Sequence, residues 1–247
     1  MLQPQTIVYL RVNEHAERTV SMQKCRHNHH RRTSRMKTLW TFGCSHTLGH
    51  GLPDCIDGLD PIPKPSQFAW PVHLSKLMDN IPLINNSHAG IGPKAVWHNV
   101  INSDIQPDDV IVIMWPCWET RIDILIDPDA KSDHALQIQA VRLWQEEDKE
   151  YFANYYHTHD RWVEWHLLAR HIQDNYPNNK LIQTTYDAYT LSSDLNSKLR
   201  VDFTEIAFGM HKYNELGYAL DGTHLGPEAH KQFAQDLHTE AVAKSLI

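Results

Sequence analysis

The sequence predicts an α/β fold, in which three layers, α/β/α, are built around a central, mostly parallel sheet. Strand-like and helix-like segments alternate from residue 36 onward, a pattern typical of parallel sheets with helices on both faces. The run VIVIMW at 110–115 is continuously apolar and rich in β-branched residues, as in strands buried on both faces. With 247 residues, of which 41% are hydrophobic, the chain can form one large domain.

The first half of the predicted domain supplies two strands and two helices. Residues 39–42 form a short apolar strand that runs into a glycine-containing turn. Six prolines or glycines mark 51–66 as a loop. A helix is expected over 70–77, with proline in its first turn, and a second strand over 81–85. Another helix follows over 94–105 and ends before a proline.

The second half begins with the strongest strand, 110–115, and continues with a section that we predict to be helical from about 130 to 176. Five apolar residues in it are spaced by three and four positions and form one stripe: Trp162, Trp165, Ala169, Ile172 and Tyr176. A fourth strand is expected at 180–185. The last helix starts at Pro227, a residue suited to the first helical position.

Charge divides the chain into two predicted parts, a basic extension at 1–35 and a domain at 36–247. The extension carries a net charge of +5 and the remaining 212 residues carry −12. An acidic domain argues against a nucleic-acid partner, which needs a basic surface. The extension contains CRHNHHRR at 25–32, which could bind a metal or an acidic partner. We favour a flexible tail, or a true translation start at Met36.

Other features of the sequence bear on the compartment. No run of 18 apolar residues predicts a membrane span, and the start lacks a secretory signal. The four cysteines show neither metal spacing nor a dense disulfide framework. A cytoplasmic protein without membrane or nucleic-acid partners is therefore the expectation, whereas the oligomeric state cannot be read from the sequence.

The segment GCSHTLGHG at 43–51 is where chemistry is expected. It places Ser45 directly after the first strand, and ligands of open parallel sheets bind beyond such strand ends. A serine hydroxyl becomes a good nucleophile only when a base, usually a histidine oriented by a carboxylate, takes its proton. Asp221 and His224 in DGTHLGPEAH, ahead of the last helix, have the spacing to form such a pair.

These two segments resemble the first and last motifs of the SGNH/GDSL hydrolase family, over roughly 36–247. The family's second motif is similar to NNSHAG at 85–90. The resemblance implies a flavodoxin-like SGNH fold and hydrolysis of acyl esters, with Ser45 as nucleophile, His224 as base and Asp221 as its orienter. It also implies that the backbone N–H groups of Ser45 and Gly90 form the oxyanion hole.

The sequence departs from the family pattern at two places. Cys44 stands where the family has aspartate, and MWPCWETR at 114–121 lacks the asparagine that completes the oxyanion hole. Some phage-encoded and other divergent relatives look similar in this segment, which is the third block of the family pattern. If this chain is phage-encoded, it could be associated with the virion. Trp115 and Arg121 would then be the matching substrate-binding positions, with the indole N–H or the guanidinium as replacement donor.

Other interpretations of these residues stay open. Ser45 could be only a helix N-cap, and Cys44 could itself be the nucleophile. The tryptophans could stack on sugars or lie in the core; Trp115 and Trp118 lie where a strand end would expose them. Arg121 could bind a substrate carboxylate or pair with a neighbouring acid.

The predicted function is hydrolysis of a small-molecule or carbohydrate ester, for instance an acetylated sugar, through an acyl-serine intermediate. We expect no metal and no organic cofactor. The alternatives are a carbohydrate- or protein-binding module that kept the fold without turnover, and an O-acyltransferase that passes the acyl group to a sugar.

Overall fold

The structure is a computed structural model that describes residues 36–57, 60–61, 64–116, 121–126, 137–142, 158–186 and 209–247. All of them belong to one unit, Met36–Ile247. The predicted extension at 1–35 lies outside the described residues, so its boundary stays a prediction. None of the helices in the described ranges has the length and apolar character needed to cross a membrane.

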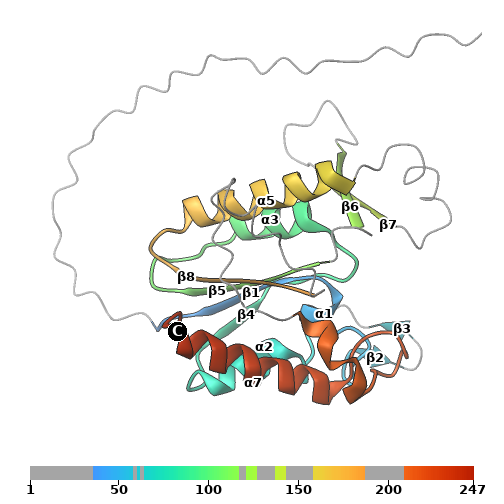
Figure 1. Cartoon of the computed structure of the whole chain (residues 1–247). Coiled ribbons are helices and arrows are strands. Elements are labelled where there is room, and N and C mark those ends of the chain that lie inside the picture. Colours follow the sequence, from blue (N-terminus) through green and yellow to red (C-terminus); the bar gives the residue numbers. More distant parts are fainter. Residues whose placement is uncertain are drawn as a thin grey trace, which may run out of the picture. The chain divides into compact units, whose positions relative to one another are not determined.

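Four parallel strands form the central sheet, in the order β4-β1-β5-β8 (Figure 1). Their bounds are β1 (Leu39–Gly43), β4 (Leu83–Asn85), β5 (Val110–Trp115) and β8 (Lys180–Thr185). In register, Trp40 of β1 lies between Ile84 of β4 and Ile111 of β5. The predicted strands and the parallel sheet are confirmed, with the second strand starting at Leu83.

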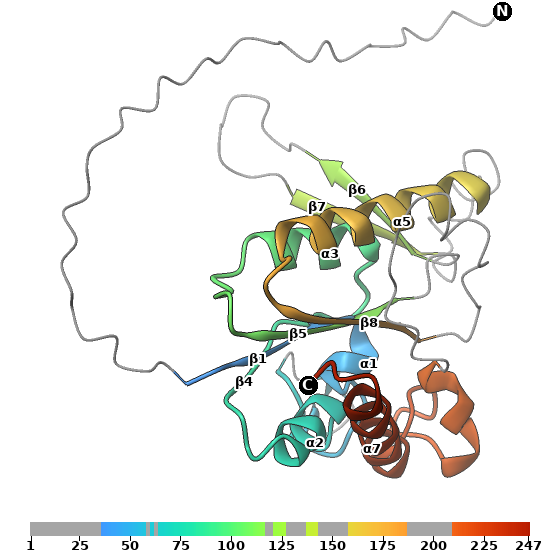
Figure 2. The same ribbon diagram turned by 60° about the vertical axis from the view of Figure 1, so that its left-hand side comes forward.

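Helices cover both faces of this sheet, which gives the predicted three layers (Figures 1 and 2). One face carries α2 (Trp70–Leu77), α7 (Pro227–Ala243) and the 3₁₀ helix η2 (Met210–Leu216); the other carries α3 (Pro93–Ile101) and α5 (Thr158–Asn175). Proline stands in the first turn of α2, α3 and α7, where its missing N–H costs no hydrogen bond.

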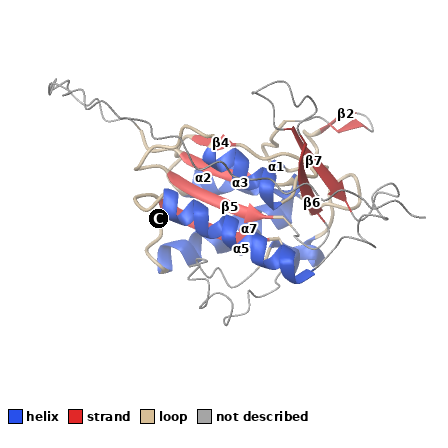
Figure 3. Cartoon of the chain, turned by 90° about the horizontal axis from the view of Figure 1, so that it is seen from above, coloured by secondary structure: helices blue, strands red, loops and turns tan. Residues whose placement is uncertain are grey.

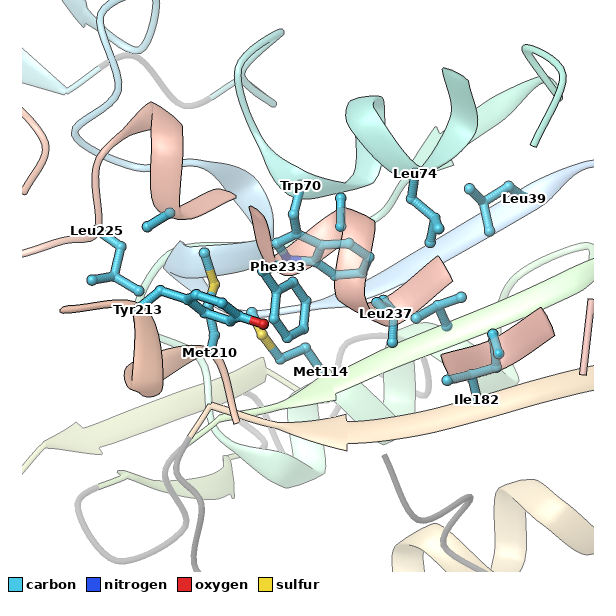
Figure 4. Packing of buried hydrophobic residues seen from close by; sticks show 14 of the residues in the cluster. Leu39, Trp70, Leu74, Met114, Ile182, Met210, Tyr213, Leu225, Phe233 and Leu237 are labelled. Atoms are coloured by element: carbon cyan, nitrogen blue, oxygen red, sulfur yellow. The ribbon is translucent and has the colours of Figure 1, made fainter. Parts of the chain in front are cut away.

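Alternation along the strands assigns side chains to the two cores. Leu39, Met114 and Ile182 pack with Trp70 and Phe233 in the core beneath α2 and α7 (Figure 4). The intervening strand residues Trp40, Phe42, Ile111 and Ile113 pack with the buried Trp165, Ala169 and Ile172 of α5. Three members of the predicted helical stripe are therefore core residues, whereas the side chain of Trp162 is outside the description.

Two antiparallel pairs of strands stand apart from the central sheet, and the sequence predicted neither. The first pair joins β2 (Ile56–Asp57) to β3 (Asp60–Pro61), within the expected loop. The second joins β6 (Arg121–Ile126) to β7 (Gln137–Arg142) (Figure 3). The prediction of a helix from about 130 is therefore wrong over β7. In RIDILI and QIQAVR, apolar residues at alternate positions fit a strand better than a helix.

Candidate active site

The candidate nucleophile lies at the carboxyl end of β1, where a one-turn helix, α1 (Ser45–Leu48), begins. The turn can be this tight because Gly43 has no side chain: a Cβ there would clash with the Thr47 side chain and lie 2.8 Å from the Met114 carbonyl oxygen. Ser45 is buried, with 3% of its surface exposed. The sharp strand-to-helix turn thus fixes Ser45 in one position beside β5.

Ser45 does not serve as a helix cap. The N-cap of α1 is Cys44, and no side-chain hydrogen bond caps the helix. The alternative interpretation of Ser45 as a mere N-cap is therefore wrong. The one hydrogen-bond contact that the Ser45 hydroxyl makes with described residues is long, 4.0 Å to Cys44 Sγ, so the hydroxyl is not committed to a strong structural bond.

A short loop before α7 holds the Asp221–His224 pair. Oδ2 of Asp221 lies 2.6 Å from Nδ1 of the His224 ring. Oδ1 accepts backbone N–H bonds from Thr223 at 2.9 Å and from His224 at 3.0 Å. Both carboxylate oxygens are thus used, and the loop itself orients the imidazole. The predicted pairing of these two residues is present in the structure.

The environment of Asp221 keeps its carboxylate charged. Partial burial by itself would raise the pKa of Asp221, but the backbone N–H bonds from His224 and Thr223, together with the His224 ring, lower it to about 2. At neutral pH the ionised carboxylate therefore accepts the Nδ1 proton of His224. This leaves Nε2 of the ring as the basic nitrogen, and Nε2 has no hydrogen-bond partner in the described ranges.

The His224 ring lies against the helical turn that carries the serine. Its centroid is 4.9 Å from that of His46, the residue after Ser45, and the His46 ring stacks on Tyr186 at 4.0 Å. Ser45 and His224, both of which the structure describes, form no hydrogen bond with each other. Catalytic hydrogen bonds in unliganded enzymes are often long and tighten when substrate binds. The structure thus brings Asp221 and His224 together and places the His224 ring beside the residue that follows Ser45.

A second loop contact, at Gly51, joins the turn after β1 to the Asp221 loop. Gly51 has φ +81°, and a Cβ at this position would lie 2.5 Å from Oδ2 of Asp221. The Gly51 carbonyl also accepts the N–H of Leu220 at 3.0 Å. The glycine-rich segment is apparent in the sequence, but this role of Gly51 is not, because only the fold shows which carboxylate lies over the glycine.

His50, the residue before Gly51, also contacts the pair. Its ring centroid is 5.0 Å from that of His224. Burial lowers the pKa of His50, positive charge on His224 lowers it further, and Asp221 opposes both effects. One ligand atom from each of His50, Asp221 and His224 can be chosen so that all three lie within 4.8 Å of one another. From its sequence position, His50 is expected only to be a loop residue that lines a cleft.

The loop after β4 approaches the serine turn through backbone bonds. The N–H of Asn86 donates to the Thr41 carbonyl at 2.9 Å, and the N–H of His88 to the Gly43 carbonyl at 3.3 Å. Asn85 Nδ2 donates to the Thr47 carbonyl of α1 at 2.9 Å. Gly90, with φ +77°, follows in the same loop. The second motif thus lies along the first, whereas a role of Gly90 in an oxyanion hole stays a prediction.

Trp115 and Arg121 are the two predicted substrate-binding positions, and the structure tests only Trp115. Trp115 is fully buried, packs on Trp165, and donates its indole N–H to Gln183 Oε1 at 2.9 Å. The expectation that the strand end exposes Trp115 is therefore wrong, and its N–H is already used. Arg121 begins β6, but the structure does not describe its side chain, and Trp118 lies outside the described residues. The similarity of this block to phage-encoded relatives stays a prediction.

Comparison with known proteins gives similarity of fold alone. No family model and no curated protein matches the chain. Among solved structures, an acetyl xylan esterase from the rumen bacterium Butyrivibrio proteoclasticus is 15% identical, with 85% of this chain and 64% of that chain covered and a TM-score of 0.45. The protein TesA is 11% identical, with 85% and 100% covered and a TM-score of 0.48.

A putative lipolytic protein of the G-D-S-L family from Desulfitobacterium hafniense is 8% identical, with 83% of this chain and 99% of that chain covered and a TM-score of 0.44. The chain thus spans less than two thirds of the acetyl xylan esterase chain but almost all of the lipolytic protein. Of these three neighbours, one is an esterase by name and one a lipolytic protein by name. At identities of 15% or less, the similarity concerns the fold and not the activity.

Proposed function

We propose that the protein is a serine hydrolase that cleaves an ester through an acyl-serine intermediate, with Ser45 as nucleophile, His224 as base and Asp221 as orienter. One observation carries the proposal: the Asp221–His224 hydrogen bond of 2.6 Å, next to the turn that presents the buried Ser45. A carboxylate bound to Nδ1 of an imidazole fixes the tautomer in which Nε2 can accept a proton.

The mechanism has two steps. In the first, His224 Nε2 takes the Ser45 proton while Oγ attacks the ester carbonyl, and the alcohol leaves with that proton. In the second, His224 activates a water molecule that hydrolyses the acyl-serine. The negative oxygen formed in each step needs donors, for which we propose the backbone N–H groups of Ser45 and Gly90.

The proposed substrate is a small acyl ester, with acetylated carbohydrates as one class. The His46 ring contacts the His224 ring and stacks on Tyr186, so aromatic surface borders the proposed reacting atoms. An uncharged acyl group fits such surroundings.

A serine-reactive fluorophosphonate probe tests the proposal directly. Wild-type protein should become labelled and should hydrolyse p-nitrophenyl acetate. Ser45→Ala should abolish labelling, whereas Cys44→Ala, the matched control at the adjacent residue, should keep it. Asp221→Asn should lower turnover by about 10⁴-fold, because the imidazole then adopts the wrong tautomer.

Labelling of Ser45→Ala at the wild-type rate would overturn the assignment of the nucleophile. If Cys44→Ala loses labelling while Ser45→Ala keeps it, the cysteine is the nucleophile. Folded wild-type protein with neither labelling nor turnover would instead favour the binding module. If the protein is an acyltransferase, then adding a sugar together with p-nitrophenyl acetate should yield an acetylated sugar as product.

A further inference from the structure

The three residues His50, Asp221 and His224 form the one group of potential metal-binding side chains among the residues that the structure describes. They come from two loops that are about 170 positions apart in the sequence. Two imidazoles and one carboxylate are a donor set that zinc accepts, usually with a water as fourth ligand in tetrahedral geometry. Neither the serine mechanism nor its oxyanion hole uses His50.

The backbone holds these donors together. The Leu220 N–H to Gly51 carbonyl bond of 3.0 Å joins the residue before Asp221 to the residue after His50. At Gly51 the absence of a side chain lets the Asp221 carboxylate lie directly on the backbone next to His50. The approach of the two loops therefore does not depend on the side-chain rotamers of the three donors.

The distances fit a metal after small side-chain movements. Zinc binds nitrogen and oxygen at about 2.0–2.2 Å, which in a tetrahedral site separates two ligand atoms by roughly 3.4 Å. The 2.6 Å contact between His224 Nδ1 and Asp221 Oδ2 would open, and the third donor, within 4.8 Å, would approach. Rotation of the His50 ring and the Asp221 carboxylate supplies movements of this size.

We propose that His50, Asp221 and His224 bind a zinc ion, and that bound zinc switches the hydrolase off. The inhibitory part rests on the proposed function. Zinc bound between His224 Nδ1 and Asp221 Oδ2 needs the Nδ1 lone pair, so the single ring proton of the neutral imidazole then resides on Nε2. A protonated Nε2 cannot accept the Ser45 proton, and the Asp221 carboxylate is held by the metal. The same three side chains would then have two exclusive states, a catalytic one with zinc absent and a silent one with zinc bound.

His50→Asn is the decisive variant, because it removes a ligand while Ser45, Asp221 and His224 stay in place. Full-length wild-type protein should lose p-nitrophenyl acetate hydrolysis as ZnCl₂ is added, and EDTA should restore it. With inhibition expressed relative to the variant's own activity without zinc, His50→Asn should need at least about tenfold more zinc than wild type for the same fractional loss. His238→Asn, which removes a histidine of α7, should behave like wild type. MgCl₂ and CaCl₂, whose ions prefer oxygen ligands, should not inhibit.

Zinc binding is measured separately from activity, by competition with a chromogenic chelator. The Ser45→Ala chain should hold one more tightly bound zinc than the Ser45→Ala, His50→Asn chain. His27, His29 and His30 are common to both chains, so any zinc bound there cancels in the difference.

Equal zinc stoichiometry in these two chains would overturn the site. Equal inhibition of wild type and His50→Asn would overturn the switch, and so would zinc-stimulated hydrolysis that survives in Ser45→Ala. A zinc difference in a chain that hydrolyses no ester would leave the site standing and refute the proposed function. Ester hydrolysis by wild type, together with equal zinc binding in the two Ser45→Ala chains, would support the proposed function and refute the zinc site.

Discussion

Replacing Gly51 by alanine tests whether the contact between two loops positions the Asp221 carboxylate. A Cβ at Gly51 would lie 2.5 Å from Asp221 Oδ2, whereas ordinary van der Waals contact begins at 3.4 Å, so the carboxylate has to move by about 0.9 Å. Misplacement by about 1 Å in an active site can cost about 100-fold in rate. We therefore expect kcat/KM for p-nitrophenyl acetate to fall about 100-fold in Gly51→Ala.

Gly217→Ala is the matched control for backbone strain. Gly217 has φ +95°, and nothing lies within 4 Å of a Cβ built there. Both substitutions force alanine to a positive φ, and at Gly217 the ψ of 171° lies in a region that only glycine adopts readily. Strain of this kind costs about 1–3 kcal/mol, which for a chain of this size lowers Tm by about 2–12 °C. Thermal unfolding should show similar losses for both variants, whereas activity should fall only in Gly51→Ala.

A double-mutant comparison decides whether Gly51 acts through Asp221. On an Asp221→Asn background, where turnover is already low, Gly51→Ala should cost far less than 100-fold, because the carboxylate that it displaces no longer orients the base. The reasoning is refuted if Gly51→Ala alone keeps wild-type kcat/KM. It is also refuted if Gly217→Ala loses as much activity as Gly51→Ala.

Three further changes probe the core, the extension and the third block. His230 is fully buried, and burial, followed by charge on His73 and His224, lowers its pKa to about 3. Below pH 6.5 this histidine is therefore protonated in the unfolded chain and neutral in the folded chain. Stability should thus fall by about 2 kcal/mol more in wild type than in His230→Asn between pH 7.5 and 5, measured by urea unfolding; equal slopes would contradict this. A chain that begins at Met36 should keep the Tm and esterase activity of the full chain, and a large loss of either would show that residues 1–35 pack on the domain. Replacing Arg121 by Lys and by Met should lower kcat if the guanidinium stabilises the oxyanion and raise KM if it binds substrate; unchanged kinetics would remove it from the site.

The parts of the fold that could be predicted are those in which local pattern and tertiary role agree. VIVIMW is apolar at every position because β5 is buried on both faces, and the strand bounds Val110–Trp115 matched the pattern. β7 falls within the section predicted to be helical from about 130, because a short amphipathic strand is easily mistaken for helix when a true helix, here α5, follows. No element is predicted over β6. Antiparallel pairing across 121–142 is a non-local property that no single window of the sequence contains.

The residues of the candidate site also fall into those that local sequence can predict and those that depend on tertiary contacts. Asp221 and His224 could be predicted as a pair, because three positions and two backbone N–H bonds within one loop suffice to bring them together. Trp115 was misplaced, because its exposure depends on α5 supplying Trp165 and on β8 supplying Gln183. Gly51 and His50 were missed for a related reason. Their partners lie in a loop that only the folded chain brings near.

These contacts imply that the candidate site is built from two separately formed halves. The strand-to-helix turn fixes Ser45 through β1 and α1, and the Asp221 loop orients His224 with bonds of its own. The Leu220–Gly51 backbone bond and the glycine under the carboxylate directly join the serine turn to the Asp221 loop. Changes at the Leu220–Gly51 contact should therefore alter the distance between Ser45 and His224 while each half stays intact. Activity should accordingly be more sensitive to the backbone at 50–51 than to the identity of aromatic residues near the His224 ring.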